Sequence, residues 1–188
     1  DKGIISFTWI LIGLVLGSLI GMVMALRVQM TGMPQMVALL NGLGGAASMV
    51  VGGAEQINRV YAGQTIDTAS LIAIAASAII GGVTLTGSLI AWAKLQEVMS
   101  GKSIVFQGQQ IVNLAIFLVC IALSAWIVTS PTNLFPYWPL ALVACLLGVT
   151  LVLPIGGADM PVAIALLNSY SGLAAAATGF VLNNAMLI

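Results

Sequence analysis

Six stretches of this sequence are each long and apolar enough to cross a lipid bilayer as a helix, and no other feature constrains the fold as strongly. Crossing the hydrocarbon core takes about 20 apolar residues. The chain is also 61% hydrophobic and only 5% charged, whereas about a quarter of an ordinary soluble domain is charged. The sequence therefore predicts an all-α, polytopic transmembrane helix bundle with helices near residues 5–26, 34–54, 67–95, 110–129, 137–155 and 160–182.

The 188 residues are predicted to form a single transmembrane domain, 1–188, that is a fragment of a longer subunit. The chain begins at Asp1 without a signal peptide, and it stops as a new apolar run begins after Asn184. Five basic and five acidic residues balance to zero formal charge, which excludes nucleic acid as a partner. Because the chain has no histidine and no cluster of Cys, Asp and Glu, no metal site is expected.

The most unusual stretch runs from Gly156 to Asn184, where an apolar helix is interrupted halfway by the polar residues 168–171. An asparagine without partners in hydrocarbon costs a few kcal/mol. Polar groups inside a membrane therefore usually face a bundle interior or a water-filled path. Helical spacing predicts one shared face for Asn168, Ser171 and Gly172.

The predicted helix 34–54 repeats this pattern of an amide followed by small residues. Its face could either pack closely against another helix or line a narrow wet path. Two helices of this kind can pack closely while holding water between Asn41 and Asn168. The residues that share the face are Asn41, Gly44, Gly45, Ser48 and Gly52.

Two other helices carry weaker patterns. In the first helix, Gly13, Gly17 and Gly21 recur every four residues, a spacing that predicts a tight helix-packing seam. The predicted helix 67–95 has a polar stripe whose hydroxyls could simply bond to carbonyls one turn back, although one or two could line a path. The stripe consists of Ser70, Ser77, Gly81, Thr84 and Ser88.

No Asp, Glu, Lys, Arg or His lies inside the core of any of the six apolar stretches. An ion pump that binds a proton on a buried carboxylate would show such a residue. If protons cross this bundle, they move mainly through water organised by polar side chains, and titration occurs at a mouth or on another subunit. The residues predicted to line such a proton path are Asn41, Ser48, Thr84, Asn168 and Ser171.

Asp159 lies just before the last predicted helix, at the start of which Pro161 stands. Its carboxylate could serve only as an N-cap, or it could couple the helix to a partner outside the membrane. The adjoining Gly156 and Gly157 would let the loop lie close under another domain. A slight excess of basic residues in the odd-numbered loops places Asp159 on the cytoplasmic side.

Three blocks of the sequence resemble, in the same order, the β-subunit membrane domain of proton-translocating nicotinamide nucleotide transhydrogenase. The resemblance covers nearly the whole chain, and its last block is highly specific. The blocks are Met30-Thr-Gly-Met-Pro34 through Asn41 to Gly45, Gly82-Val-Thr-Leu-Thr-Gly-Ser88 with Lys94, and Gly156-Gly-Ala-Asp-Met-Pro161 with Leu167-Asn-Ser-Tyr-Ser-Gly172 and Ala174-Ala-Ala-Ala-Thr-Gly-Phe180.

This resemblance implies a subunit fragment of an enzyme that couples hydride transfer between NAD(H) and NADP(H) to proton translocation. Both nucleotides would bind to other domains, so this chain would hold no cofactor and perform no hydride chemistry. The implied location is the bacterial cytoplasmic (inner) membrane. The implied partners are α-subunit membrane helices, further β-subunit helices with their NADP(H)-binding domain, a peripheral NAD(H)-binding domain, membrane lipid and a second protomer in a homodimer.

The resemblance also implies roles for three residues. Asn168 matches a polar residue of the family's proton path, and Asp159 matches an acid at the cytoplasmic mouth that communicates with the NADP(H) domain. Asn41 stands where well-known members carry a histidine implicated in proton transfer, but an amide does not titrate near neutral pH. Either a partner subunit supplies the titrating group or water alone bridges the gap. The alternative function is a non-enzymatic membrane transporter or a structural subunit of a larger membrane complex.

Overall fold

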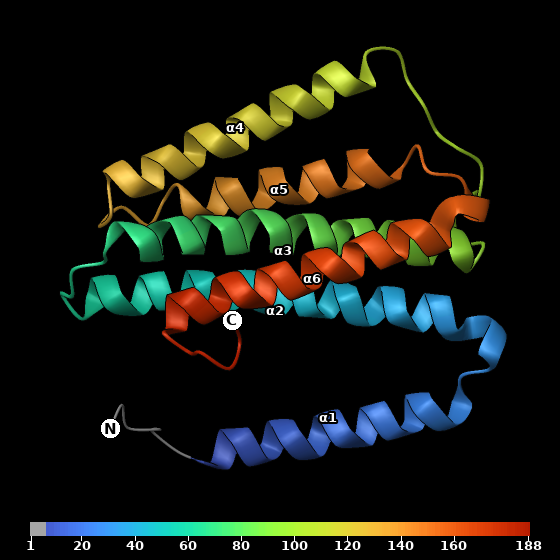
Figure 1. Cartoon of the computed structure of the whole chain (residues 1–188), viewed down its shortest axis with the longest axis horizontal. Coiled ribbons are helices and arrows are strands. Elements are labelled where there is room, and N and C mark those ends of the chain that lie inside the picture. The colour runs from blue at the N-terminus through green and yellow to red at the C-terminus, as the bar shows by residue number, and fades with distance from the viewer. Residues whose placement is uncertain (1–6) are drawn as a thin grey trace.

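The computed structural model describes residues 7–188, and every regular element in this range is helical. Successive long helices run in opposite directions and are joined at alternating ends of the bundle (Figure 1). The prediction of an all-α bundle is therefore confirmed. The α-helices are α1 (Phe7–Arg27), α2 (Met33–Tyr61), α3 (Thr68–Leu95), α4 (Gln109–Thr129), α5 (Tyr137–Val152) and α6 (Met160–Leu182), with 3-10 turns η1 (Met30–Gly32) and η2 (Gly157–Asp159).

The sequence predicted six membrane-spanning helices, whereas five of the helices among residues 7–188 are long and apolar enough to span a membrane and α5 is shorter. The sequence predicted α5 as 137–155, but the helix ends at Val152. Pro154 has no N–H to donate to the carbonyl of Thr150, so the helical ladder stops there. The side chain of Gln109 donates to that carbonyl instead, at 2.8 Å, and so joins α4 to α5.

The end of α2 is the main correction to the predicted boundaries. The sequence predicted a helix over 34–54 and a polar loop from Glu55 to Ile66, whereas the helix continues to Tyr61. Glu55 and Arg59 are four residues apart, and their side chains pair at 2.7 Å along the helix. The change from apolar to polar residues therefore marks the end of the apolar stretch and not the end of the helix. The predicted start of the first helix at residue 5 lies outside the described residues.

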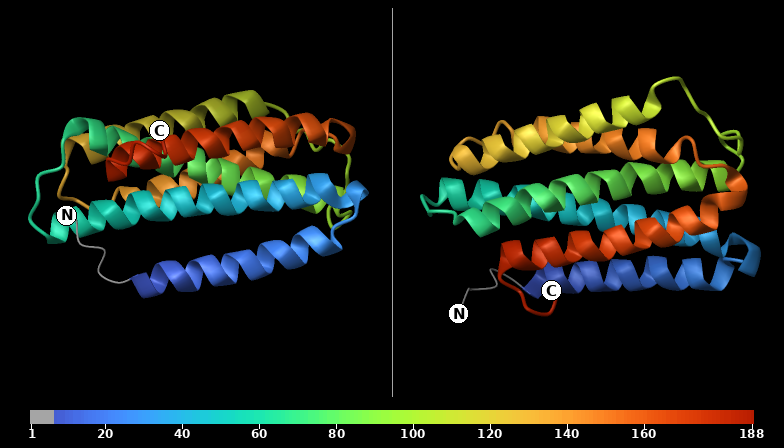
Figure 2. Two further views of the ribbon diagram at one scale, coloured as in Figure 1. Left: turned by 60° about the horizontal axis from the view of Figure 1, so that its bottom comes forward. Right: turned by 45° about the horizontal axis from the view of Figure 1, so that its top comes forward.

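Helix α3 occupies the centre of the bundle and packs against α2, α5 and α6, while α4 lies outside α5 (Figures 1 and 2). It has the most buried residues of all the helices, since it meets neighbours on several sides. Helix α1 lies apart from this group, and none of its residues is buried. Within residues 7–188, a Cβ added to Gly13, Gly17 or Gly21 would meet no atom within 4 Å, so the packing seam of this helix remains a prediction.

The two ends of the bundle are named here by a charged residue at each. The Asp159 end comprises η1, the α3–α4 loop and the α5–α6 loop with η2. The Arg59 end comprises the C-terminal turns of α2 and α6, the α2–α3 loop and the α4–α5 loop. Any path across the membrane would have to connect these two ends.

Candidate functional site

Buried polar side chains follow the facing sides of α2, α3 and α6 from one end of the bundle toward the other. From Asn41 to Gln56 is 15 residues of α2, or about 22 Å of helix rise. That length is most of the hydrocarbon thickness of about 30 Å. We call the set the polar column; it consists of Asn41, Ser48 and Gln56 on α2, Ser77, Thr84 and Ser88 on α3, and Thr178 on α6.

Two side-chain hydrogen bonds connect the three helices along this column. The Nδ2 of Asn41 donates to the carbonyl of Ile164 in α6 at 3.3 Å. The hydroxyl of Ser77 donates to the carbonyl of Ser48 at 2.7 Å and lies 3.5 Å from the hydroxyl of Thr178. The predicted path residues Asn41, Ser48 and Thr84 are thus all brought into one interior.

The members of the column differ in how much hydrogen-bonding capacity they have left. Thr84 donates to the carbonyl of Ile80 in its own helix at 2.6 Å, as a self-satisfied hydroxyl would. By contrast, both amide atoms of Gln56 and the hydroxyl of Ser88 are buried without a hydrogen-bond partner among residues 7–188. Buried polar groups normally find a partner in protein or ordered water. Gln56 and Ser88 are therefore the positions at which the column has capacity to bind water.

Glycines let the helices approach closely beside the column. A Cβ added to Gly45 would lie 2.6 Å from the carbonyl oxygen of Gly81, so the backbones of α2 and α3 touch there. A Cβ added to Gly44 would lie 2.7 Å from the hydroxyl of Ser171 on α6. The small face of α2 thus makes close helix contacts, and its polar residues are enclosed between them.

Asn168 lies outside this interior. It is exposed, as is Gly172, because the buried side of α6 is occupied by apolar residues that include Ile164 and Leu167. The sequence predicted water between Asn41 and Asn168, but Asn41 instead reaches the turn of α6 that precedes Asn168. The roles of Asn168, Ser171 and Gly172 remain predictions, and Asn168 would meet a path from the open side of α6.

At the Asp159 end, the loop that carries Gly156 and Gly157 is held by backbone contacts. The N–H of Gly157 donates to the carbonyl of Gly101 in the α3–α4 loop at 2.8 Å. Asp159 occupies the N-cap position of α6 but makes no side-chain cap hydrogen bond, and it is exposed. Its carboxylate is therefore free to meet a partner.

Lys94 is buried although it stands at the end of a helix. It lies at the C-terminal end of α3, but only 3% of the residue is exposed. Its ammonium group is turned into the protein and donates to carbonyls of both loops of the Asp159 end. A long side chain at a helix end does not show from sequence alone whether it extends outward or folds inward.

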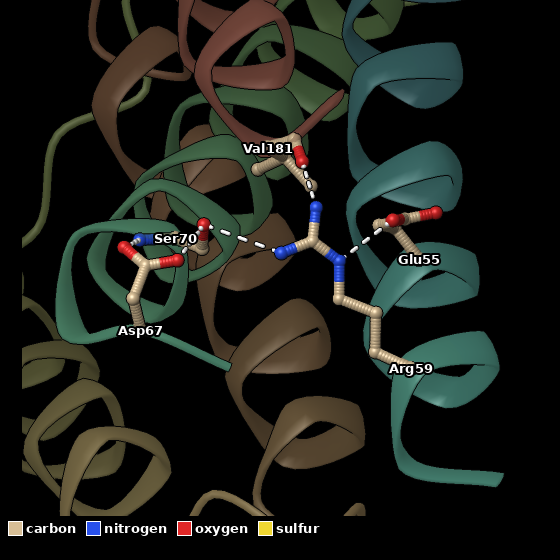
Figure 3. A network of polar contacts seen from close by, with 5 residues as sticks. All are labelled: Glu55, Arg59, Asp67, Ser70 and Val181. Atoms are coloured by element: carbon tan, nitrogen blue, oxygen red, sulfur yellow. Dashed lines mark hydrogen bonds and ion pairs between the residues drawn. The ribbon is translucent and has the colours of Figure 1, made fainter. Parts of the chain in front are cut away.

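At the Arg59 end, one guanidinium group ties three helices together (Figure 3). Arg59 donates to Glu55 on α2 at 2.7 Å, to the carbonyl of Val181 on α6 at 2.6 Å and to the hydroxyl of Ser70 on α3 at 3.4 Å. Ser70 in turn donates to Asp67, the N-cap residue of α3. A cation is well placed here because the carbonyls at the C-terminus of α6 lack helical partners.

Sequence reasoning missed Gln56, Thr178 and the Arg59 cluster as parts of the interior. Gln56 was assigned to a loop, although it lies four residues beyond Gly52 and continues the face that begins at Asn41. The spacing of four between Glu55 and Arg59 was the available signal that the helix continues. For Thr178 the available signal was its position seven residues after Ser171, which places both hydroxyls near one face of α6.

Replacing Asp67 with asparagine is expected to remove an acid-sensitive part of the stability of the Arg59 end. Hydrogen bonds from the side chain and the backbone N–H of Ser70 lower the pKa of Asp67 below its ordinary value of 3.8; desolvation opposes them and the charge of Arg59 assists. Because the folded-state pKa is the lower one, the stabilisation is complete above pH 3.8 and is lost as the pH falls through the folded-state value.

Thermal unfolding in detergent, followed from about pH 7 down to about pH 3, measures this effect. The wild type should lose stability more steeply on acidification than Asp67→Asn, since asparagine can still cap α3 but cannot take up a proton. Parallel pH curves for the two proteins would contradict the assigned shift.

Comparisons with known proteins agree with the resemblance. A family model described as NAD(P) transhydrogenase beta subunit matches residues 1–188. The chain is 36% identical over 187 residues to a curated protein named NAD(P) transhydrogenase subunit beta from Rhodospirillum rubrum, and a second protein of that name from a strain of this bacterium matches equally. The match covers 97% of this chain but 40% of the length of each relative.

Proposed function

Because this chain belongs to the family of NAD(P) transhydrogenase beta subunits, we propose that it forms the part of the enzyme that carries protons through the membrane. In this proposal, hydride transfer between NAD(H) and NADP(H) on peripheral domains is coupled to proton movement through the bundle. The polar column is the observation that supports it. A purely structural bundle would gain nothing from burying the amide of Gln56 and the hydroxyl of Ser88 without a hydrogen-bond partner among residues 7–188, because a buried polar group costs free energy unless it is hydrogen-bonded.

The column would conduct protons and not store them. Its members are amides and hydroxyls, none of which changes charge near neutral pH. A proton would therefore pass along water molecules held by these groups, and titration would occur at a mouth or on a partner. Asp159, the exposed last residue of η2, is the carboxylate that would face the nucleotide-binding domain.

The nucleotides would bind to other domains of the complex. A dinucleotide-binding fingerprint follows a β-strand, and residues 7–188 contain no strand that could present one. The partners proposed are α-subunit membrane helices, further β-subunit helices with the NADP(H)-binding domain, the NAD(H)-binding domain and a second protomer, in a bacterial inner membrane. The exposed helix α1 with its three glycines offers these helices a surface on which to pack.

The proposal is tested by proton pumping in the complete enzyme, reconstituted in sealed vesicles and driven by hydride transfer between the nucleotides. The wild type should acidify or alkalinise the vesicle interior in step with hydride transfer. Asn168→Leu should lose most of this pumping, because Asn168 is proposed to meet the path from the open side of α6 and leucine there could not hold water. Ser169→Ala is a matched control, since Ser169 is also exposed and its hydroxyl donates to the carbonyl of Ala165 in its own helix. A wild-type enzyme that transfers hydride without moving protons would contradict the proposed function.

A further inference from the structure

The ammonium group of Lys94 is buried among backbone carbonyls at the Asp159 end of the bundle. It donates to the carbonyl of Leu153 at 2.5 Å, to that of Ile155 at 2.7 Å and to that of Lys102 at 3.3 Å. A lysine ammonium has three N–H donors, so these contacts use its full capacity. No carboxylate among residues 7–188 pairs with it, since the ion pair found there joins Arg59 to Glu55.

The acceptors of Lys94 belong to two different loops. Leu153 and Ile155 follow α5, where the last carbonyls of a helix lack partners and the helix dipole favours a cation. Lys102 lies in the α3–α4 loop. Lys94 itself is part of α3, so a single side chain fastens both loops to the central helix.

These two loops are also bonded directly to each other. The N–H of Ile104 donates to the carbonyl of Leu153 at 3.2 Å, and the hydroxyl of Ser103 donates to the carbonyl of Pro154. Further along, Gly157 donates to Gly101. We call residues 96–108 and 153–159 the two-loop platform; because its backbone segments are joined, they are expected to move together, and Asp159 moves with them.

The platform connects to the polar column through α3. Ser88 and Thr84 lie six and ten residues before Lys94 on the same helix, or about 9 and 15 Å along its axis. Helix α3 also contacts η2, and its residue Ala91 packs in one apolar cluster with Met160 at the start of α6. A shift of the platform relative to α3 would therefore displace the residues of the polar column that lie nearest the Asp159 end.

A buried ammonium group is a costly way to hold two loops if stability is the only requirement. An apolar side chain of similar length would fill the space without the loss of hydration that a charge suffers. Buried charges are better explained where they select one arrangement over others. Lys94 selects the arrangement in which three particular carbonyls converge on one point.

We propose that Lys94 is a positioning residue that fixes the two-loop platform to α3, so that a displacement of Asp159 by the nucleotide-binding domain is transmitted to the polar column. This inference rests on the proposed function for what displaces Asp159 and for what the column carries. We call the three hydrogen bonds from Lys94 to the platform carbonyls the clasp, and its existence depends only on the geometry at Lys94. The two parts can therefore be tested separately.

The experiment compares Lys94→Met with Lys102→Met in the complete enzyme, reconstituted in sealed vesicles. Lys102 is exposed and contributes only its backbone carbonyl to the clasp, so the same substitution there leaves every contact of Lys94 in place. Two quantities are measured: the ratio of protons pumped to hydride transferred, and hydrogen–deuterium exchange of the backbone over 153–159. In Lys94→Met, exchange should rise at least about tenfold, and the ratio should fall several-fold while Lys102→Met stays at the wild-type values.

A folded Lys94→Met enzyme with the wild-type ratio and wild-type exchange overturns the proposal. If Lys94→Met does not fold, Lys94→Gln decides, because glutamine keeps part of the hydrogen bonding without the charge. It should show raised exchange and a lowered ratio, and wild-type values for it also overturn the proposal. If the wild-type enzyme moves no protons, the proposed function fails, and the exchange measurement alone then decides whether Lys94 clasps the platform.

Discussion

Replacing Asn41 with leucine is expected to lower the rate of proton pumping at least about tenfold, which corresponds to a rise of about 1.4 kcal/mol in the barrier to transport. Asn41 is the amide of the polar column nearest the Asp159 end, and it is 5% exposed. Its side chain joins α2 to α6 through the carbonyl of Ile164. Leucine would leave an apolar segment that cannot hold water between the Asp159 end and the hydroxyls deeper in the bundle.

Folding should survive this substitution, which separates the effect on transport from an effect on structure. Leucine has the same number of side-chain heavy atoms and the same branching as asparagine, and the carbonyl of Ile164 lies within α6, so it keeps its helical N–H partner when the amide is removed. Asn58→Leu is the matched control, because Asn58 is an exposed amide on the same helix. The two variants are compared in sealed vesicles by proton pumping and by thermal unfolding. Equal pumping in Asn41→Leu and in the wild type would exclude Asn41 from the path.

The helices themselves could be predicted well from the sequence, because apolar stretches of membrane length leave few alternatives. The end of α2 could not, since hydropathy falls at Glu55 while the helix continues through the Glu55–Arg59 pair. Pro154 shows the opposite case: the apolar residues continue beyond Val152, but the missing N–H ends α5. Hydropathy reports the depth of a residue in the membrane, whereas helix ends depend on local hydrogen bonds.

The candidate site was predictable only in part, for a different physical reason. Helical spacing correctly grouped Asn41, Gly45 and Ser48 on one face of α2, since that grouping is a property of a single helix. It could not show which helix that face meets. The same spacing predicted a polar face on α6 that begins at Asn168, yet Asn168 is exposed. Which helix faces pack together is decided by how the larger apolar side chains fit, and the sequence of a single helix does not show which helices it contacts.

Adding side-chain volume at Gly45 is expected to destabilise the bundle in proportion to the volume added. In an ordinary helix interior, alanine is preferred over glycine by about 1 kcal/mol, so an uncrowded Gly45→Ala would be stabilising. At this position, however, the new Cβ would lie 2.6 Å from the carbonyl oxygen of Gly81 and 2.8 Å from the Cβ of Thr84. Neither is the free end of a flexible side chain, so α2 and α3 would have to move apart, and such overpacking typically costs about 1–3 kcal/mol.

The series Gly45→Ala and Gly45→Val therefore tests the close contact of α2 and α3. The decisive result is whether Gly45→Ala lowers or raises the unfolding temperature. Both variants should unfold at lower temperature than the wild type, with valine the less stable, because its added methyl groups extend the overlap. Gly32→Ala is the control, since a Cβ there would meet only a side-chain atom of Val28 at 3.7 Å. Unfolding of the complete enzyme in detergent measures all three. A Gly45→Ala enzyme more stable than the wild type would show that the two backbones do not touch, and the polar column would then lack the wall that encloses it between α2 and α3.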